Sequence, residues 1–344
     1  MTFSSTHDRP ITPAEVLGGT APAQLAVDYL EAVAGTGDIA ERNVRAWGRF
    51  SIVPRAFRTG EHVDVTTELF GIPLALPVIA APSAGHGLGN LLGEAETARG
   101  VHRAGTTLAL SQSASAVIPA VAEAVGPYFQ QIYLPEDRDS IRGILESTVD
   151  AGARALVWTV DQLDTEFQHP FRTALREWSQ TQVVENAGKV GAPARFVSLD
   201  DLTFLKEASG LPVIVKGILH PDDALRAIDA GADGIVVSNH GGRQIGASVT
   251  TAEVLQEIAV AVDRRVPVLV DSGIRTADDV FIALALGASA VMLGRPVVRA
   301  LWRDGDDGVA KVFDDLRLEL AGLFAMTGVR SIREIDANWL RGRA

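Results

Sequence analysis

The chain of 344 residues contains no cysteine. This absence excludes structural disulfides, thiolate nucleophiles, iron–sulfur clusters and thiolate zinc sites, so any redox chemistry would require a bound cofactor. Basic residues are also scarce, since 31 Lys and Arg face 43 Asp and Glu, which gives a net charge of −12. A protein of this charge has no broad basic field to attract nucleic acid or an anionic membrane, and any anion must be bound by local groups.

Long apolar runs are missing as well. No stretch approaches the roughly 18 uncharged apolar residues of a membrane-spanning helix, and the N-terminal residues lack a basic region followed by an apolar core. We therefore expect a cytoplasmic protein without a membrane partner. Hydrophobic residues at 47% and charged residues at 22% are typical of a globular protein, which excludes disorder and collagen-like repeats.

One unit repeats from residue 77 onward: a short apolar run, a polar loop and then a helical pattern. Eight such runs can be counted, and they are continuous rather than alternating. Strands of this kind, separated by amphipathic helices, predict parallel pairing with both faces buried. Eight βα units predict an α/β fold of the (β/α)8 TIM barrel class, whereas an open doubly wound sheet would need fewer units. The expected strands cover residues 77–83, 107–111, 128–134, 154–161, 212–217, 234–240, 267–273 and 290–296.

Two segments fall outside this repeat. Residues 1–76 include a helical stretch over 24–33, and we expect them to form a helical cap on the N-terminal end of the barrel that residues 77–344 build. Residues 162–197 lie between the fourth strand and its helix and are too many for a simple loop, which predicts a lid-like insert on the catalytic face. No second compact domain is recognisable, so we expect a single domain overall.

Polar residues gather where the predicted strands end. The active site of a TIM barrel is built at the carboxyl ends of its strands, so groups from distant parts of the sequence converge there. A single polar strand end could be a structural accident, but eight such ends favour a binding site. The residues concerned are Pro82, Ser83, Ala84, Ser111, Gln131, Tyr133, Thr159, Asp161, Lys216, Ser238, His240, Gly241, Arg243, Asp271, Gly273, Arg275, Gly294 and Arg295.

The last two strand ends carry DSGIR and LGR, in which glycines bring backbone amides close to a ligand beside Arg275 and Arg295. TIM barrels commonly hold a phosphate at this place. The alternative is that both arginines are surface residues paired with acids such as Asp278 and Asp279.

Lys216 follows a buried run and is a Schiff-base nucleophile, a structural ion-pair partner or a fixed positive charge. A neighbouring phosphate favours the charge, facing a cofactor ring.

His240 is the one histidine between polar residues at a strand end, and a Gly-Gly pair beside it lets a substrate approach. Proton transfer fits this position, and Asp161 at the end of the fourth strand could orient the imidazole and stabilise its charged form. A lone histidine is more often structural, but these neighbours favour a functional role. The histidines show no ligand spacing, so no metal is expected.

These motifs together carry a family resemblance. With VSNHGGRQ, VIVKGI, DSGIR and LGRP at strand ends, the sequence resembles the FMN-dependent α-hydroxy-acid oxidase and dehydrogenase family over nearly the whole chain. APSAGHGL and KGILHPDDA look most like its lactate oxidase branch. The resemblance implies FMN, with Lys216 facing flavin N1 and O2 and Asp271 on the ribityl chain. The phosphate ligands that it implies are Gly273, Arg275, Gly294 and Arg295. The other cofactor contacts that it implies are Pro82, Ser83, Ala84, Ser111, Gln131, Thr159, Ser238, His240, Gly241 and Arg243.

By the same resemblance, His240 would remove the substrate hydroxyl proton as hydride passes to flavin N5, and a carbanion route would use the same base. Asp161 would stabilise the protonated His240. Arg243 would pair with the substrate carboxylate, while Tyr29 and Tyr133 would hydrogen-bond the carboxylate and the hydroxyl. Oxygen would reoxidise the flavin. We expect the small-molecule substrate and O2 as partners and a homo-oligomer, since the family is often tetrameric.

Two departures from the family bear on the substrate. The family has a second carboxylate-binding arginine seven residues beyond the aspartate that ends strand four, where this chain has Gln168. Arg172 or Arg176 could replace it. Ser113 stands where glycolate oxidase keeps a bulky aromatic, which widens the expected pocket.

The leading interpretation is therefore oxidation of a 2-hydroxy acid or its derivative to the 2-oxo product. The alternative is an FMN oxidase of a larger non-carboxylate alcohol, amine or ester. The His-Gly-Gly-Arg sequence argues against an FMN barrel isomerase, and the intact His240, Tyr133 and Asp161 argue against a flavin-binding protein without activity.

Overall fold

The computed structural model describes residues 9–58, 63–162 and 194–342. Eight parallel strands form one sheet in the order β4-β11-β10-β9-β8-β7-β6-β5, and a bridge between Ala80 and Leu108 joins its two outer strands. The expected TIM barrel is confirmed, with every strand inside a predicted range or within one residue of it. The strands are β4 (Val78–Ala80), β5 (Ala109–Leu110), β6 (Phe129–Ile132), β7 (Ala155–Thr159), β8 (Val213–Ile218), β9 (Gly234–Val237), β10 (Val268–Val270) and β11 (Ala290–Leu293).

Burial explains the continuous apolar runs of these strands. Seven of them are buried at every residue, and β8 is interrupted only at Gly217. Alternate side chains, such as Phe129, Val157, Ile214 and Leu269, form the core inside the barrel. The remaining side chains pack outward against the helices.

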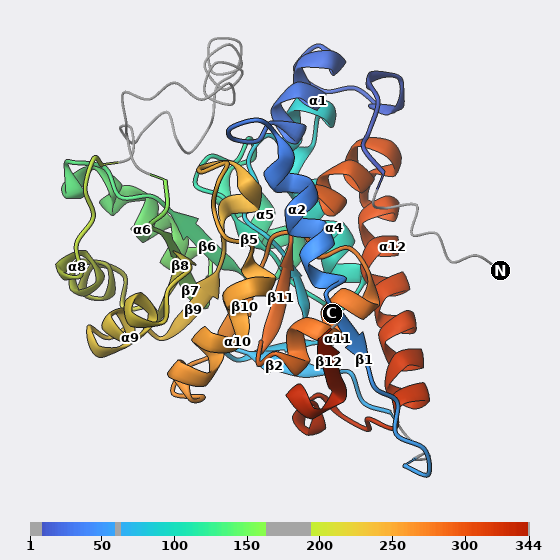
Figure 1. The fold of residues 1–344 in the computed structure, drawn as a ribbon. Coiled ribbons are helices and arrows are strands. Elements are labelled where there is room, and N and C mark those ends of the chain that lie inside the picture. Colours follow the sequence, from blue (N-terminus) through green and yellow to red (C-terminus); the bar gives the residue numbers. More distant parts are fainter. Residues whose placement is uncertain (1–8, 59–62, 163–193, 343–344) are drawn as a thin grey trace.

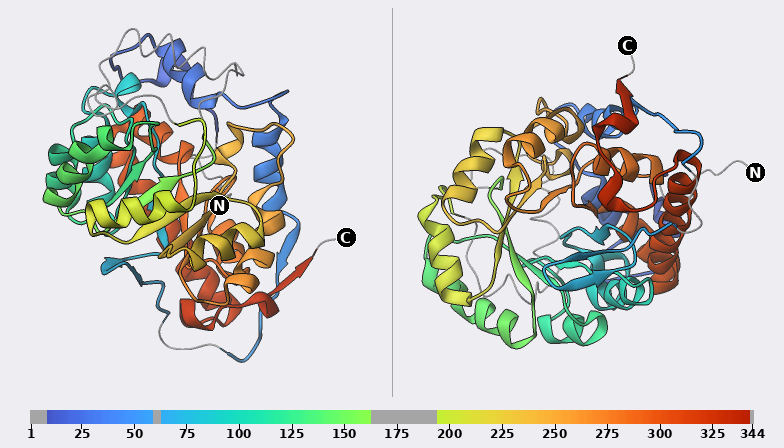
Figure 2. Two further views of the ribbon diagram at one scale, coloured as in Figure 1. Left: turned by 90° about the vertical axis from the view of Figure 1, so that its left-hand side faces the viewer. Right: turned by 90° about the horizontal axis from the view of Figure 1, so that it is seen from below.

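A helix follows each strand and packs outside it, as the view from below in Figure 2 shows. The long last helix contains a non-helical residue, Gly305, with φ +63°. These helices are α4 (Gly93–Arg103), α5 (Ile118–Val125), α6 (Arg142–Asp150), α8 (Asp200–Ser209), α9 (Pro221–Asp229), α10 (Thr251–Val262), α11 (Ala277–Ala285) and α12 (Arg295–Thr327).

The N-terminal segment does not stay at one end of the barrel, and in this respect our expectation was wrong. The hairpin of β2 (Thr67–Leu69) and β3 (Ile72–Leu74) covers the N-terminal ends of the strands, where Phe70 meets Phe129 edge to face at 6.0 Å. Helix α1 (Ala23–Glu31) instead lies at the carboxyl ends (Figure 1). The last carbonyls of a helix lack intrahelical partners, and those of α1 accept hydrogen bonds from arginines located there.

Helix α2 (Asp38–Trp47) fastens the loops that follow β9 and β10. The side-chain amides of Asn43 and Asn239 exchange hydrogen bonds at 3.0 and 2.7 Å. Trp47 Nε1 donates to the Ser272 carbonyl at 3.1 Å. Gly273 has φ +87°, and a Cβ there would lie 2.1 Å from the Asn43 carbonyl oxygen, so glycine is required for this close approach.

Short elements complete the described part of the chain. Strand β1 (Phe50–Ile52) pairs antiparallel with β12 (Leu340–Gly342).

Most of the expected insert, residues 163–193, lies outside the described residues, so its lid role stays a prediction. None of the helices within the described ranges has the length and apolar character needed to cross a membrane. The other short elements are η1 (Pro13–Glu15), α3 (His86–Gly89), η2 (Arg138–Ile141), η4 (His240–Gly242), η5 (Ile332–Glu334) and η6 (Ala337–Trp339).

The hairpin should contribute to stability through its buried side chains. Leu74 is 2% exposed and belongs to the core inside the barrel. Replacing Leu74 with Ala should lower the free energy of unfolding by about 2–5 kcal/mol, because methyl groups are lost and a cavity is left. Chemical denaturation measures this, with Glu68→Ala on an exposed position of the same hairpin as the control. Equal stability of the two variants would contradict a core role for the hairpin.

Candidate active site

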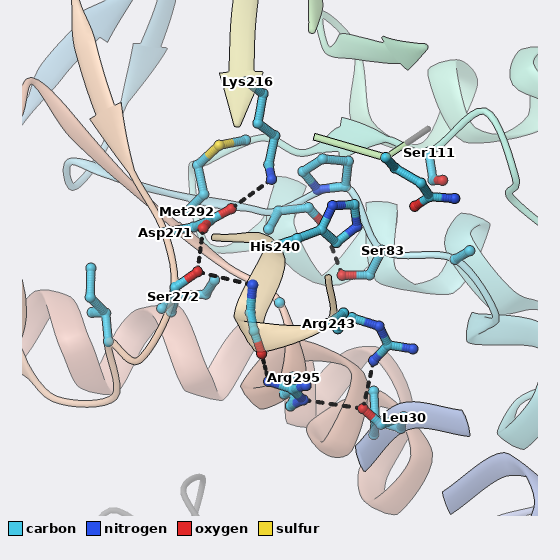
Figure 3. A pocket seen from close by; sticks show the side chains of 18 of the residues that line it. Leu30, Ser83, Ser111, Lys216, His240, Arg243, Asp271, Ser272, Met292 and Arg295 are labelled. Carbon is cyan, nitrogen blue, oxygen red and sulfur yellow. Dashed lines mark hydrogen bonds and ion pairs between the residues drawn. The ribbon is translucent and has the colours of Figure 1, made fainter. Parts of the chain in front are cut away.

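A pocket opens at the carboxyl ends of the barrel strands, beside the end of α1 (Figure 3). Its empty space, including the open mouth, is about 1030 Å³. The structure therefore brings most of the predicted site residues together. Those that line the pocket are Tyr29, Pro82, Ser83, Ala84, Ser111, Tyr133, Lys216, His240, Gly241, Arg243, Asp271, Gly273, Arg275, Gly294 and Arg295.

Three further predicted cofactor contacts are buried and do not line the pocket. Gln131 Nε2 donates to Thr159 Oγ1 at 3.1 Å, and Gln131 Oε1 accepts from Ser111 Oγ at 3.3 Å. Ser238 Oγ accepts from Lys216 Nζ at 2.8 Å. Gln131, Thr159 and Ser238 are at most 3% exposed, and in this structure Gln131 and Ser238 support Ser111 and Lys216 at the pocket, while Thr159 contacts Gln131.

Gln168 lies outside the described residues, as do Arg172 and Arg176. The pocket also contains residues that the strand-end analysis did not select. Ser272 and Ile274 belong to the DSGIR motif, which could have identified them, whereas the apolar residues give no chemical signal. Ser113 lines the pocket as expected, and the unselected lining residues are Leu30, Ala81, Gln162, Ser272, Ile274, Met292 and Leu293.

The predicted pair of His240 and Asp161 is formed, with Nδ1 and Oδ1 2.9 Å apart. Burial raises the pKa of Asp161, but the charges of His240 and Lys216 outweigh burial and hold this pKa below its ordinary value. The carboxylate therefore stays ionised and can accept a hydrogen bond from Nδ1–H. In this tautomer Nε2 is the ring nitrogen that can take a proton.

Two unusual backbone conformations shape this pair. His240 has φ +58°, and its backbone N–H donates to Ser238 Oγ at 3.0 Å. Gly217 has φ +111° at an irregularity in the pairing of β8 with β9. A Cβ at Gly217 would lie 2.7 Å from Asp161 Cβ and Cγ. Glycine at this position thus makes room for the carboxylate that holds His240.

Lys216 forms a buried ion pair with Asp271, with Nζ 3.0 Å from Oδ2. Burial lowers the pKa of Lys216, but Asp271 and Asp161 outweigh that effect and raise the pKa above its ordinary value. A Schiff-base nucleophile needs a neutral amine. The charged state therefore favours the expected fixed positive charge at the pocket wall.

Positive charge is concentrated at one side of the pocket by Arg243, Arg275 and Arg295. Arg243 donates to the carbonyls of Tyr29 at 2.8 Å and Leu30 at 3.0 Å, and Arg295 Nε donates to the Leu30 carbonyl at 3.1 Å. Burial, together with the charge of Arg243, lowers the pKa of Arg295 to about 9. A bound anion would relieve this accumulation of charge. Both Arg275 and Arg295 are part of the pocket wall, which argues against the surface-residue alternative.

Tyr29 is buried and Tyr133 is half-buried, and removal from water raises the pKa of each hydroxyl. For Tyr133 the charge of Asp161 raises the pKa further. Both side chains therefore remain neutral hydrogen-bond donors at ordinary pH. The Tyr29 ring lies 5.1 Å from the Arg243 guanidinium carbon, and a Cβ at Gly85 would lie 2.6 Å from Tyr29 Cε1. Gly85 thus allows this ring to pack at the pocket.

Comparison with known proteins identifies the family of this site. A family model described as FMN-dependent dehydrogenase matches residues 21–342. The chain belongs to this family. An L-lactate oxidase of Lentilactobacillus hilgardii is 38% identical over 310 residues, which cover 85% of this chain and 83% of the relative. A peroxisomal (S)-2-hydroxyacid oxidase of Arabidopsis thaliana is 37% identical, with 87% of each chain covered.

A solved structure of a mandelate oxidase with (S)-2-phenylpropionate superimposes with a TM-score of 0.85 at 34% identity, covering 96% of this chain and 97% of the other. A mandelate oxidase variant with 2-hydroxy-phenylacetamide also gives a TM-score of 0.85 at 34% identity, covering 94% and 95%. Together with the family match, these results show that the protein is a TIM-barrel oxidoreductase that depends on FMN.

The residues present fit FMN. A Cβ at Gly294 would lie 3.3 Å from Ser83 Oγ, and one at Gly241 would lie 3.2 Å from the Arg295 guanidinium, so side chains at these glycines would crowd the pocket wall. The nearby guanidinium groups suit a phosphate. Lys216 places a buried cation against the same pocket, which suits a ring that becomes more negative on reduction.

Gly217→Ala should impair the reaction because its Cβ would push Asp161 away from His240. We expect FMN content to be retained and the rate of flavin bleaching by substrate to fall about tenfold to a hundredfold, since displacing a reacting group by about 1 Å can cost this much. Anaerobic stopped-flow absorbance measures the rate. Gly210→Ala is the matched control, because Gly210 also has positive φ, +69°, but open space around it. Equal rates in the two variants would show that the contact with Asp161 is unimportant.

Proposed function

We propose that the protein oxidises a 2-hydroxy acid, or a derivative of one, to the 2-oxo product with O2 as the final electron acceptor. The observation that carries this proposal is the pair of His240 and Asp161 beside a pocket that also contains Arg243 and Tyr133. The names of the relatives, L-lactate oxidase and (S)-2-hydroxyacid oxidase, support the same reaction class.

FMN, when bound, supplies the acceptor for the two electrons that leave the substrate. Gly273, Arg275, Gly294 and Arg295 would hold its phosphate, and Lys216 would place its charge at the ring. Asp271 would contact the ribityl chain. Further contacts would come from Pro82, Ser83, Ala84, Ser111 and Gly241, with Gln131, Thr159 and Ser238 acting through the residues they support.

His240 would take the substrate hydroxyl proton at Nε2, because Nδ1 is engaged by Asp161. The proton makes the imidazole cationic, and the ionised Asp161 stabilises that charge. Whether the carbon–hydrogen bond breaks as a hydride or after formation of a carbanion, the same base serves. The left-handed backbone at His240 holds the ring at the pocket wall.

Arg243 would bind the substrate carboxylate or carbonyl. Its bonds to the Tyr29 and Leu30 carbonyls fix the guanidinium in place, so little ordering is needed when a ligand binds. The neutral hydroxyls of Tyr29 and Tyr133 would donate to the substrate carboxylate and hydroxyl.

A bulkier substrate than lactate is the finer part of this proposal. Gln168 stands where the family has a second arginine, and Ser113 at the pocket wall is small. A neutral amide can hydrogen-bond a carbonyl but cannot neutralise a carboxylate. Two mandelate oxidase variants have structures with 2-hydroxy-phenylacetamide and with 4-Br-2-hydroxy-methylphenylacetate. These ligands favour the second candidate, oxidation of a larger non-carboxylate substrate.

The cytoplasmic location and the homotetramer expected from the sequence are also proposals, and they rest on the composition and on the family resemblance. We also propose that the partners are a small-molecule substrate and O2, and that the protein binds neither nucleic acid nor a membrane.

Replacing His240 with Ala should leave FMN binding largely intact but slow flavin reduction by roughly 10²- to 10⁴-fold, the usual effect of removing a positioned base. Anaerobic bleaching with a panel of 2-hydroxy acids, esters and amides identifies a substrate and then gives the rate. His102→Ala, an exposed position at the end of α4, is the control. Reduction of the His240→Ala protein at the unaltered rate would exclude His240 as the base.

Substrate choice should depend on Gln168. We expect lactate and glycolate to have a much lower kcat/KM than a bulky aryl hydroxy acid or its ester, and Gln168→Arg should shift preference toward the free acid by about tenfold or more. Gln256→Arg adds the same charge at an exposed position on α10 and serves as the control. Efficient lactate turnover by the unaltered protein would instead assign the missing arginine's role to Arg172 or Arg176.

A further inference from the structure

Ser272 occupies a backbone conformation that suits glycine better than serine. Its φ is +74°, in the left-handed region that L side chains rarely adopt. Strained residues of this kind persist where the surrounding structure holds them in place, and they gather at functional sites. Ser272 lines the pocket immediately after Asp271.

The surroundings hold the Ser272 backbone without help from its side chain. The Ser272 carbonyl accepts from Trp47 Nε1 at 3.1 Å and from Thr251 Oγ1 at 3.2 Å. The next residue, Gly273, is pressed against the backbone of α2. Glycine at position 272 would therefore keep the loop shape with less strain, and the serine side chain needs another explanation.

The hydroxyl of Ser272 connects two parts of the active site, as the dashed lines in Figure 3 show. Ser272 Oγ donates to Asp271 Oδ1 at 2.7 Å, and the other oxygen of this carboxylate pairs with Lys216. The same Oγ accepts from the backbone N–H of Gly241 at 3.0 Å. Gly241 directly follows His240, so one hydroxyl links the buried ion pair to the turn that carries the proposed base.

We propose that Ser272 is a positioning residue that orients the carboxylate of Asp271, and through it the charge of Lys216 toward FMN, while fixing the turn of His240. This inference rests on the FMN site of the proposed function. Without the hydroxyl, Asp271 Oδ1 loses a hydrogen-bond donor, and the electrostatic interaction of the carboxylate with Lys216 becomes stronger. Lys216 then stabilises the negative charge of reduced FMN less than in the unaltered protein. The reduction potential of bound FMN therefore falls. The Gly241 N–H also loses its acceptor, which loosens the His240 turn.

Two substitutions separate the hydroxyl from the backbone strain. Ser272→Gly removes both, whereas Ser272→Ala removes the hydroxyl and keeps the strain. We expect both FMN-loaded variants to show a lower potential, measured as an approximately tenfold higher ratio of oxidised to reduced FMN at one fixed potential of a reference dye. Both should also be reduced by substrate about tenfold more slowly. Ser272→Gly should unfold at a higher temperature than Ser272→Ala.

Asp263→Gly is the matched control, because Asp263 is another non-glycine residue with positive φ, +48°, at the end of α10. This variant should raise the unfolding temperature and leave the potential and the rate unchanged. The proposal fails if Ser272→Gly keeps the wild-type potential and rate. It also fails if Ser272→Gly does not fold or bind FMN, since the hydroxyl would then be needed for the loop itself. The dye titration needs no substrate, so a wrong substrate class would not obscure the result.

Discussion

The concentration of buried and half-buried positive charge at one end of the barrel is the constraint on which the rest of the site depends. Lys216, Arg243, Arg275 and Arg295 all reach one pocket of a chain whose net charge is −12. Buried charges are costly unless they are paired or hydrogen-bonded. Interactions within the protein offset this cost. Lys216 pairs with the Asp271 carboxylate, and Arg243 and Arg295 donate hydrogen bonds to backbone carbonyls at the end of α1. The partial negative charge of a helix carboxyl end makes those carbonyls suitable acceptors.

This arrangement explains why the N-terminal segment is divided between the two ends of the barrel. The β2–β3 hairpin fills the apolar opening at the N-terminal ends, which requires only hydrophobic side chains. At the other end, α1 meets the arginines and α2 fixes the loops after β9 and β10. The helices therefore belong to the active site rather than to a separate cap. The position of Tyr29 in the pocket follows from the place of α1.

The barrel could be predicted from the sequence because its strands are buried on both faces and each is a continuous apolar run. Strand ends also indicated most of the pocket, since parallel strands bring their carboxyl ends together. The place of α1 could not be predicted in this way, because it meets Arg243 and Arg295 through its own backbone carbonyls, which every sequence possesses. Gln131, Thr159 and Ser238 have the polarity of pocket residues but are buried and do not line the pocket, and only packing distinguishes these two cases. Ser272 could not be singled out from the sequence, because a serine is common and only its positive φ in the structure marks it as unusual.

The origin of the pocket residues separates cofactor binding from substrate selection. Lys216, Asp271, Gly294 and Arg295 lie on barrel strands or directly after them, where the fold fixes their positions. Tyr29, Ser113 and Gln162 lie on α1 and on the loops after β5 and β7, outside the regular barrel. Loops can change without disturbing the strands that support them, which is why one barrel can serve different chemistries. The charge that suits FMN is thus built into the part of the fold that tolerates least change, whereas Tyr29, Ser113 and Gln162 occupy the part that tolerates most.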